Sequence, residues 1–180
     1  PFKRAARALT VVPFVLPTVV VGSAFLALLG PRSPLNALGT ALFGEAFPQV
    51  RLDGSVEAIL IAHVFYNLAV IIRLVGGMWA HIDPQAEEAA RLLGASAWRT
   101  VREGTWPWLR PAVISAASIV VLFTVTSFGV VLLLGGPRDT TLEVEIYRQT
   151  AILLDLPTAA ALTLLQMGGV FVLLLASARA

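Results

Sequence analysis

The sequence contains no cysteine in its 180 residues. This absence excludes disulfide bonds, metal or iron–sulfur sites with thiolate ligands, and a thiol nucleophile. Charged residues are also scarce, at 13% of the chain, whereas hydrophobic residues make up 57%. The mean hydropathy of +0.82 lies well outside the range of soluble domains. The composition therefore predicts a membrane protein.

Several apolar stretches are long enough to cross a bilayer, which requires about 20 residues in a helix. We expect spans at 8–30, 57–80, 111–135 and 158–178. The third contains no ionisable residue, and Pro111 suits the first turn of a helix. Pro13 and Pro17 predict a kinked first helix. A secretory signal is the alternative interpretation of this apolar run, but the run is too long and lacks a small-residue cleavage site followed by a polar chain. The fold class is therefore an all-α polytopic membrane bundle.

Basic residues between the spans predict the orientation of the chain, because cytoplasmic loops carry an excess of Lys and Arg. Eight of the 13 Lys and Arg residues lie at the two ends and in the 81–110 loop. Both ends and this loop are therefore expected in the cytoplasm. The loops at 31–56 and 136–157 are expected outside. The chain starts with Pro1 and ends just beyond an apolar run, so we expect a segment of a longer protein.

The 81–110 loop reads as two short helices. Asp83 is a suitable N-cap, Pro84 occupies the first turn, and Glu87 lies near the positive end of the helix dipole. Gly94 is a natural stop. The second helix is expected from Ser96 to Pro107. Small side chains form a narrow apolar stripe on the first helix, which predicts a docking element for a cytoplasmic partner. They are Ala86, Ala89, Ala90 and Leu93.

The run Glu88-Ala89-Ala90, with Gly94 and Pro107 after it, resembles the EAA loop of permease subunits of binding-protein-dependent ABC importers. In that family the loop forms coupling helices that sit in a cleft of the ATP-hydrolysing subunit. The resemblance thus implies that Asp83, Glu87 and these residues couple the chain to an ATPase. Gly104 and Trp106 depart from the aliphatic pair usual before the proline.

Stretches outside the loop resemble the thiamine and ferric-iron branch of these importers, and "GGPRDTTLEVEIY" at 135–147 is more similar to the thiamine permeases. The segment is most like the first half of such a permease. The resemblance implies a bacterial inner-membrane protein that works with a cytoplasmic ATPase dimer, an extracytoplasmic binding protein, and a second permease half or copy. Thiamine is the first expected substrate and ferric iron the second. ATP would be bound by the ATPase, so no cofactor is expected in this chain. No nucleic-acid partner is expected either.

Polar residues in the spans allow two interpretations. His63 and Asn67 are four residues apart and share a helix face. Together with Ser127 and Gln166 they could line a transport pathway, as ionisable groups in membranes often do. Hydrogen bonds between helices are the alternative. In the outer segment, Glu143 and Glu145 could receive basic groups of a binding protein or simply be solvated. This segment permits a short strand or an interfacial helix, and we favour the helix.

Other function classes lack their motifs. The sequence contains no G-x-x-x-x-G-K-[ST] phosphate loop and no H-E-x-x-H metal motif, and no span carries paired carboxylates. A passive channel would need a ring of charges or a carbonyl filter, and neither pattern occurs. A membrane enzyme and a passive channel are therefore the remote alternatives to an importer permease.

Overall fold

The computed structural model describes residue 13 and residues 16–178, and these residues form helices and loops without strands. The elements follow one another along the chain as α2 (Thr18–Leu29), α3 (Pro34–Phe43), α4 (Val56–Trp79), α5 (Pro84–Leu92), α6 (Ala97–Arg99), the π-helix η1 (Thr100–Thr105), α7 (Trp106–Val125), α8 (Gly129–Leu134), α9 (Leu142–Tyr147), the π-helix η2 (Arg148–Ile152) and α10 (Leu156–Ala178). The predicted all-α fold class is confirmed.

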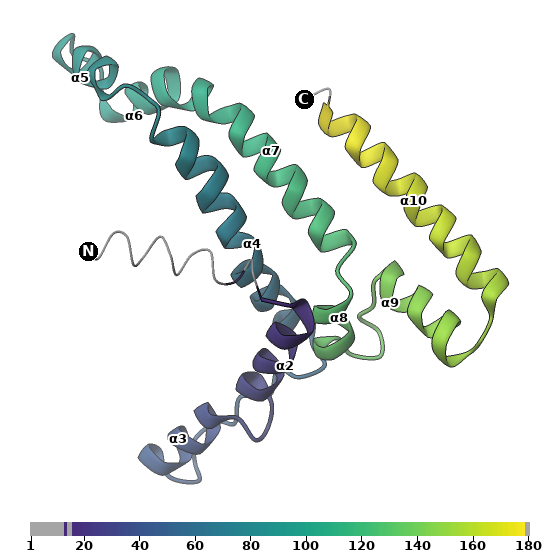
Figure 1. Ribbon diagram of the computed structural model, residues 1–180. Coiled ribbons are helices and arrows are strands. Elements are labelled where there is room, and N and C mark those ends of the chain that lie inside the picture. Colours follow the sequence, from purple (N-terminus) through teal and green to yellow (C-terminus); the bar gives the residue numbers. More distant parts are fainter. Residues whose placement is uncertain (1–12, 14–15, 179–180) are drawn as a thin grey trace.

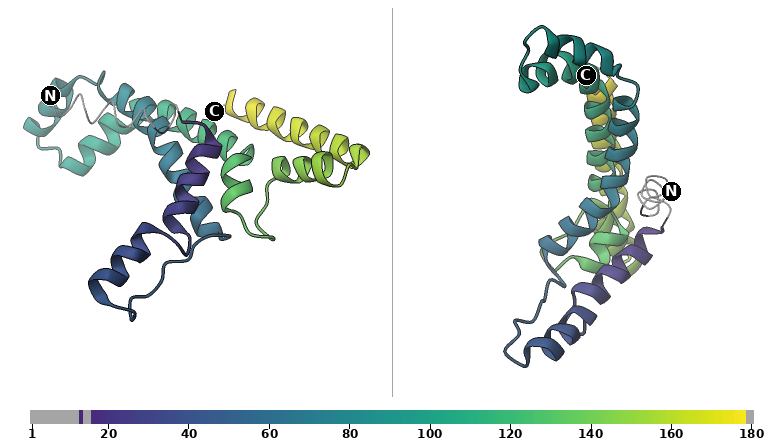
Figure 2. Two further views of the ribbon diagram at one scale, coloured as in Figure 1. Left: turned by 60° about the horizontal axis from the view of Figure 1, so that its bottom comes forward. Right: turned by 90° about the vertical axis from the view of Figure 1, so that its left-hand side faces the viewer.

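The helices form an open layer rather than a globule. Figure 1 shows α4 and α7 as an antiparallel pair with α10 beyond them, and the right-hand view of Figure 2 shows this layer edge-on. The accessible surface of 12536 Å² exceeds the roughly 8,400 Å² expected for a folded soluble monomer of 19.1 kDa. Many large apolar side chains of the helices are exposed, and in a membrane protein such faces are covered by lipid or by other parts of the protein.

The core of the molecule lies where α2, α4 and α8 meet. Small alanines of α4 allow close approach, and branched residues of α8 fill the space between the helices. The buried members are Leu29, Ala58, Ile59, Ala62, Val130, Val131 and Leu134. Gly129 lets α2 and α8 touch, because a Cβ atom there would lie 2.7 Å from Thr18 Oγ1. Close helix crossings in membranes commonly depend on such small residues.

The long helices can be compared with the expected spans. α4 and α10 differ from 57–80 and 158–178 by two residues or fewer at each end. For the first span, residues 8–12 and 14–15 lie outside the described part of the chain. Pro17 does not kink a helix interior but directly precedes α2, where its missing N–H leaves no backbone bond unmade. The loop at 31–56 contains α3, and the loop at 136–157 contains α9 and η2.

The expectation of a single helix over 111–135 is wrong. α7 begins five residues earlier, at Trp106, and ends at Val125, and α8 follows after a break. The hydroxyls of Thr124 and Thr126 donate to carbonyls one turn back, and Thr141 Oγ1 donates to the carbonyl oxygen of Ser127 at 2.8 Å. Side chains therefore bond backbone groups around the break, which makes it tolerable in an apolar setting.

Candidate coupling hairpin and membrane-embedded polar residues

α5 has a defined start and a defined end. The Asp83 carboxylate accepts a hydrogen bond from the Gln85 amide at 2.9 Å, and Pro84 occupies the first turn. At the other end, the Gly94 amide donates to Arg91 O and the Ala95 amide to Ala90 O, both at 3.0 Å. These two bonds form a Schellman motif, in which Gly94 adopts the left-handed conformation with φ 89°. The N-cap and the stop predicted for this helix are confirmed.

The second arm of the hairpin is not a separate short helix, which corrects the expectation of a helix ending at Pro107. α6, η1 and α7 continue into one another over Ala97–Val125. Pro107 lies in the first turn of α7, and Pro111 lies inside that helix rather than at its start. In η1 the Trp106 amide bonds to Val101 O, five residues back. The wider π turn thus lets the chain pass Pro107 without breaking the helix.

Among the described residues of the hairpin, one hydrogen bond joins the two arms. Thr105 Oγ1 of η1 donates to Glu87 Oε1 of α5 at 2.5 Å, and Thr105 is only 1% exposed. Arg91 Nη2 lies 4.0 Å from the other oxygen of Glu87. Glu87 therefore stabilises the hairpin by linking α5 to η1, and we call this link the brace. Sequence reasoning did not identify Thr105, because it lies 18 residues away from its partner and no local pattern marks it.

The opposite face of α5 is open. Glu88 and Ala89 are exposed, and Ala90 is half-buried. Leu92 and Leu93 are 89% and 90% exposed. Figure 1 shows α5 beyond the ends of α4 and α7. Among the described residues, the Glu88 carboxylate has no ion-pair partner. Behind this face, a pocket of about 650 Å³ separates α5 from η1 and the end of α4.

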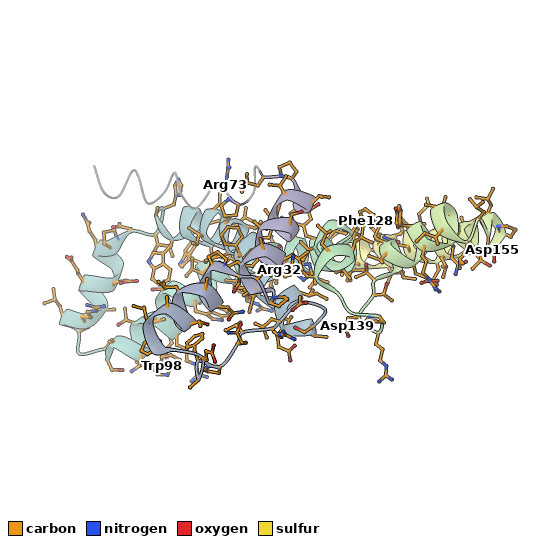
Figure 3. All side chains as sticks on the ribbon, turned by 90° about the horizontal axis from the view of Figure 1, so that it is seen from below. Arg32, Arg73, Trp98, Phe128, Asp139 and Asp155 are labelled. Atoms are coloured by element: carbon orange, nitrogen blue, oxygen red, sulfur yellow. The ribbon has the colours of Figure 1, made fainter. Side chains whose placement is uncertain are left out.

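Two of the predicted pathway residues meet between α4 and α8. His63 Nε2 lies 2.8 Å from Ser127 Oγ, and Asn67 Nδ2 donates to the carbonyl of His63 at 2.9 Å. Asn67 is buried, and its Oδ1 atom has no hydrogen-bond partner within the described chain. Phe128 beside this break packs edge-on against Tyr147 of α9, with ring centroids 5.3 Å apart. Arg73, further along α4, projects away from the helix layer (Figure 3).

The remaining polar residues meet between α9 and α10. Gln166 Nε2 of α10 donates to Glu143 Oε1 at 2.6 Å. Glu145 is held by Arg148, which donates from Nε and Nη2 at 2.9 Å, and by Gln149. These hydrogen bonds, that of Arg148 first, lower the pKa of Glu145 below its usual value. The favoured helix in this segment is confirmed as α9. The contact between Glu143 and Gln166 was not predicted.

A family model described as "binding-protein-dependent transport system inner membrane component" matches residues 1–179. The chain belongs to this family. It is therefore part of a multi-pass transport permease of the ABC importer type, and its relatives are permeases rather than enzymes.

Curated relatives include the thiamine transport permease ThiP of Escherichia coli K12, 34% identical over 169 residues, which covers 93% of this permease segment and 31% of the relative. ThiP of Haemophilus influenzae is 36% identical, with coverages of 91% and 30%. The putative 2-aminoethylphosphonate permease PhnU of Salmonella typhi is 27% identical, with coverages of 84% and 53%. The segment spans about a third of the length of the ThiP relatives. The resemblance to thiamine permeases is confirmed, and these relatives give no support to ferric iron.

Solved structures agree on the fold. A bacterial ABC transporter that imports the polysaccharide alginate superposes on this permease with a TM-score of 0.80 at 16% identity, covering 99% of this chain and 65% of that chain. A second structure of an alginate transporter, in complex with its periplasmic protein, has a TM-score of 0.79 at 17% identity and coverages of 98% and 64%. At these identities the likeness establishes the permease fold alone.

Proposed function

We propose that this segment forms part of the translocation pathway of an ATP-driven thiamine importer and couples it to a separate ATPase dimer through the hairpin at 81–110. The observation that carries the coupling role is the open face of α5. Two leucines about 90% exposed stand beside Glu88, which has no ion-pair partner in the described part of the chain, on a helix capped at both ends. Apolar residues ringed by charge at the tip of a polar loop are typical of a protein interface.

The hairpin is built to transmit a displacement. Thr105 ties α5 to η1, and η1 continues into α7 without a break. The helix over Ala97–Val125 has 29 residues, so it is about 43 Å long. α7 packs along α4, the other helix that leaves the hairpin. A push on α5 by the ATPase would therefore move α4 and α7 together, and alternating access requires such a rigid-body movement.

Thiamine is proposed because the ThiP relatives are thiamine permeases at 34% and 36% identity. The rest of the assembly follows from the family and is proposed with it. A soluble binding protein would deliver substrate on the outer side of the membrane, where we expect the loop at 136–157 to face it. A second permease half or copy would complete the pathway, and this segment would correspond to the first half of the full protein. The bacterial inner membrane would hold the chain with both ends of the segment inside the cell.

Reconstitution of the full-length permease with its ATPase and binding protein in proteoliposomes tests this function. We expect ATP-dependent uptake of labelled thiamine. Gly94→Val should uncouple ATP hydrolysis from uptake, because a β-branched residue disfavours the positive φ that ends α5. Gly94→Asn is the matched control, since asparagine tolerates this conformation. Normal coupling in Gly94→Val would contradict the role of the hairpin, and failure of the wild type to take up thiamine would contradict the substrate.

A further inference from the structure

A groove between α7, α9 and α10 contains an acidic group without a basic partner. The groove has a volume of about 750 Å³, and its lining includes Glu143, Thr163, Gln166 and Phe171. Within the described part of the chain, Glu143 forms no ion pair, and its hydrogen bond comes from the Gln166 amide. Glu143 is half-buried, and a carboxylate that is partly removed from water without a cation favours a positive partner.

The contact lies near the middle of α10 along the helix axis. Gln166 is the eleventh residue of α10, about 15 Å along a helix about 33 Å long. Of the described spans, α10 is also the one least covered by the rest of the protein, since only 6% of its apolar stretch is buried. Figure 1 shows α9 lying beside α10. Ionisable residues at such a depth commonly mark the path of a substrate or ion.

A second observation points to the same ligand chemistry. Gln166 is 9% exposed, and its Oε1 atom has no hydrogen-bond partner among the described residues. The hydroxyls of Thr126 and Thr163 donate to carbonyls of their own helices at 2.8 Å, which leaves their lone pairs free to accept. The groove therefore offers mainly hydrogen-bond acceptors and one negative charge.

We propose that Glu143 and Gln166 form a recognition site for an organic cation in the translocation pathway. The carboxylate pairs with the positive charge, and the Gln166 carbonyl accepts from a donor on the substrate. Phe171, Met167 and Leu174 line the same groove and supply aromatic and apolar contact for flat rings. Thiamine has this chemistry, with a quaternary thiazolium and an aminopyrimidine, whereas a phosphonate would be repelled. The assignment of thiamine rests on the proposed function, but the preference for a cation does not.

The alternative is that the bond between Gln166 and Glu143 only holds α9 against α10. A glutamine at position 143 would still accept this bond, so Glu143→Gln separates the two roles. In the reconstituted transporter we expect Glu143→Gln to lower thiamine uptake about ten-fold, as expected for loss of a charged hydrogen-bond partner. Glu143→Asp keeps the charge and should retain more uptake. Glu45→Gln removes an exposed charge beyond α3 and should transport normally.

A labelling experiment tests the site without relying on transport. The segment has no cysteine, so Thr163→Cys can place one thiol in the groove once any cysteines elsewhere in the full protein are replaced. This thiol should react about ten-fold faster with a positively charged trimethylammonium methanethiosulfonate than with the negatively charged sulfonate reagent, once each rate is divided by the rate of the same reagent with a free thiol in solution. Glu143→Gln should abolish this preference, and thiamine should slow the reaction.

The outcomes are distinguishable. Wild-type thiamine uptake with normal uptake in Glu143→Gln would overturn the site and leave the proposed function intact. No thiamine uptake in the wild type, together with a cation preference that depends on Glu143, would overturn the substrate and support the site. Equal reaction of the two reagents in the Thr163→Cys protein would overturn the site even if Glu143→Gln failed to assemble.

Discussion

Replacement of Thr105 by valine removes the hydrogen bond between the two arms of the hairpin and preserves the shape of the side chain. The lost bond runs from Thr105 Oγ1 to a carboxylate oxygen of Glu87 at 2.5 Å. Hydrogen bonds to charged groups contribute about 1.5–3 kcal/mol. The Glu87 side chain is 28% exposed, so water partly replaces the bond and we expect about 1.5 kcal/mol. This value corresponds to about a ten-fold increase in the open population of α5.

Hydrogen exchange of the full permease measures this opening directly. The amides of α5 should exchange about ten-fold faster in Thr105→Val, while those of α7 should change little, because opening of the hairpin leaves the long helix folded. Thr100→Val is the matched control. Thr100 is also buried, but its hydroxyl donates to Ser96 O within its own arm, so its loss should leave α5 unchanged.

A double-mutant cycle shows whether the effect belongs to this bond. Glu87→Met, which keeps the length of the side chain but cannot accept the bond, should alone speed exchange in α5. Thr105→Val should then add little, because the pair shares one interaction. Unchanged exchange of α5 in Thr105→Val, or fully additive effects in the cycle, would refute the brace and with it the proposal that α5 and α7 move as one body.

Three further predictions concern the rest of the fold. Gly129→Ala should lower the melting temperature of the detergent-solubilised permease, since overpacking costs about 1–3 kcal/mol, whereas Gly76→Ala, where a Cβ meets nothing within 4 Å, should not. A double-mutant cycle of His63→Ala and Ser127→Ala should give a coupling energy of about 0.6 kcal/mol in unfolding measurements. A coupling energy near zero would show that this bond does not stabilise the contact between α4 and α8. The pKa of Asp155 lies below its usual value because Thr158 donates hydrogen bonds to it from its side chain and its backbone amide. The ionised Asp155 should therefore stabilise the start of α10 above the ordinary carboxyl pKa, and this stabilisation should be lost as the pH falls through the lowered pKa. Exchange of the first α10 amides should follow this titration in the wild type but not in Asp155→Asn.

Local chemistry made α5 predictable. Asp83 and Pro84 mark the start of the helix and Gly94 marks its stop, and these local signals do not depend on contacts with the rest of the protein. Length and hydropathy likewise located α4 and α10. The Glu-Ala-Ala spacing led to the family, because it combines with a polar loop between apolar runs.

The break after Val125 could not be read from local pattern, because hydropathy continues through Ser127 and Phe128 into α8. Contacts distant in sequence produce it, namely the packing of Gly129 against α2 and the bond from Thr141 to the Ser127 carbonyl. The meeting of Glu143 with Gln166 has the same origin, since it depends on the reversal between η2 and α10. Amphipathic periodicity describes one helix at a time, so it does not report such pairings.

The central claim is that the hairpin at 81–110 receives the ATPase inside the cell. Leu93→Cys in the assembled transporter, otherwise free of cysteine, tests it most directly, because Leu93 is 90% exposed at the tip of α5. A membrane-impermeant maleimide should label this thiol only in inside-out vesicles, and the bound ATPase should protect it and form a cross-link with it. Labelling from the outer surface, or equal labelling with and without the ATPase, would contradict the account.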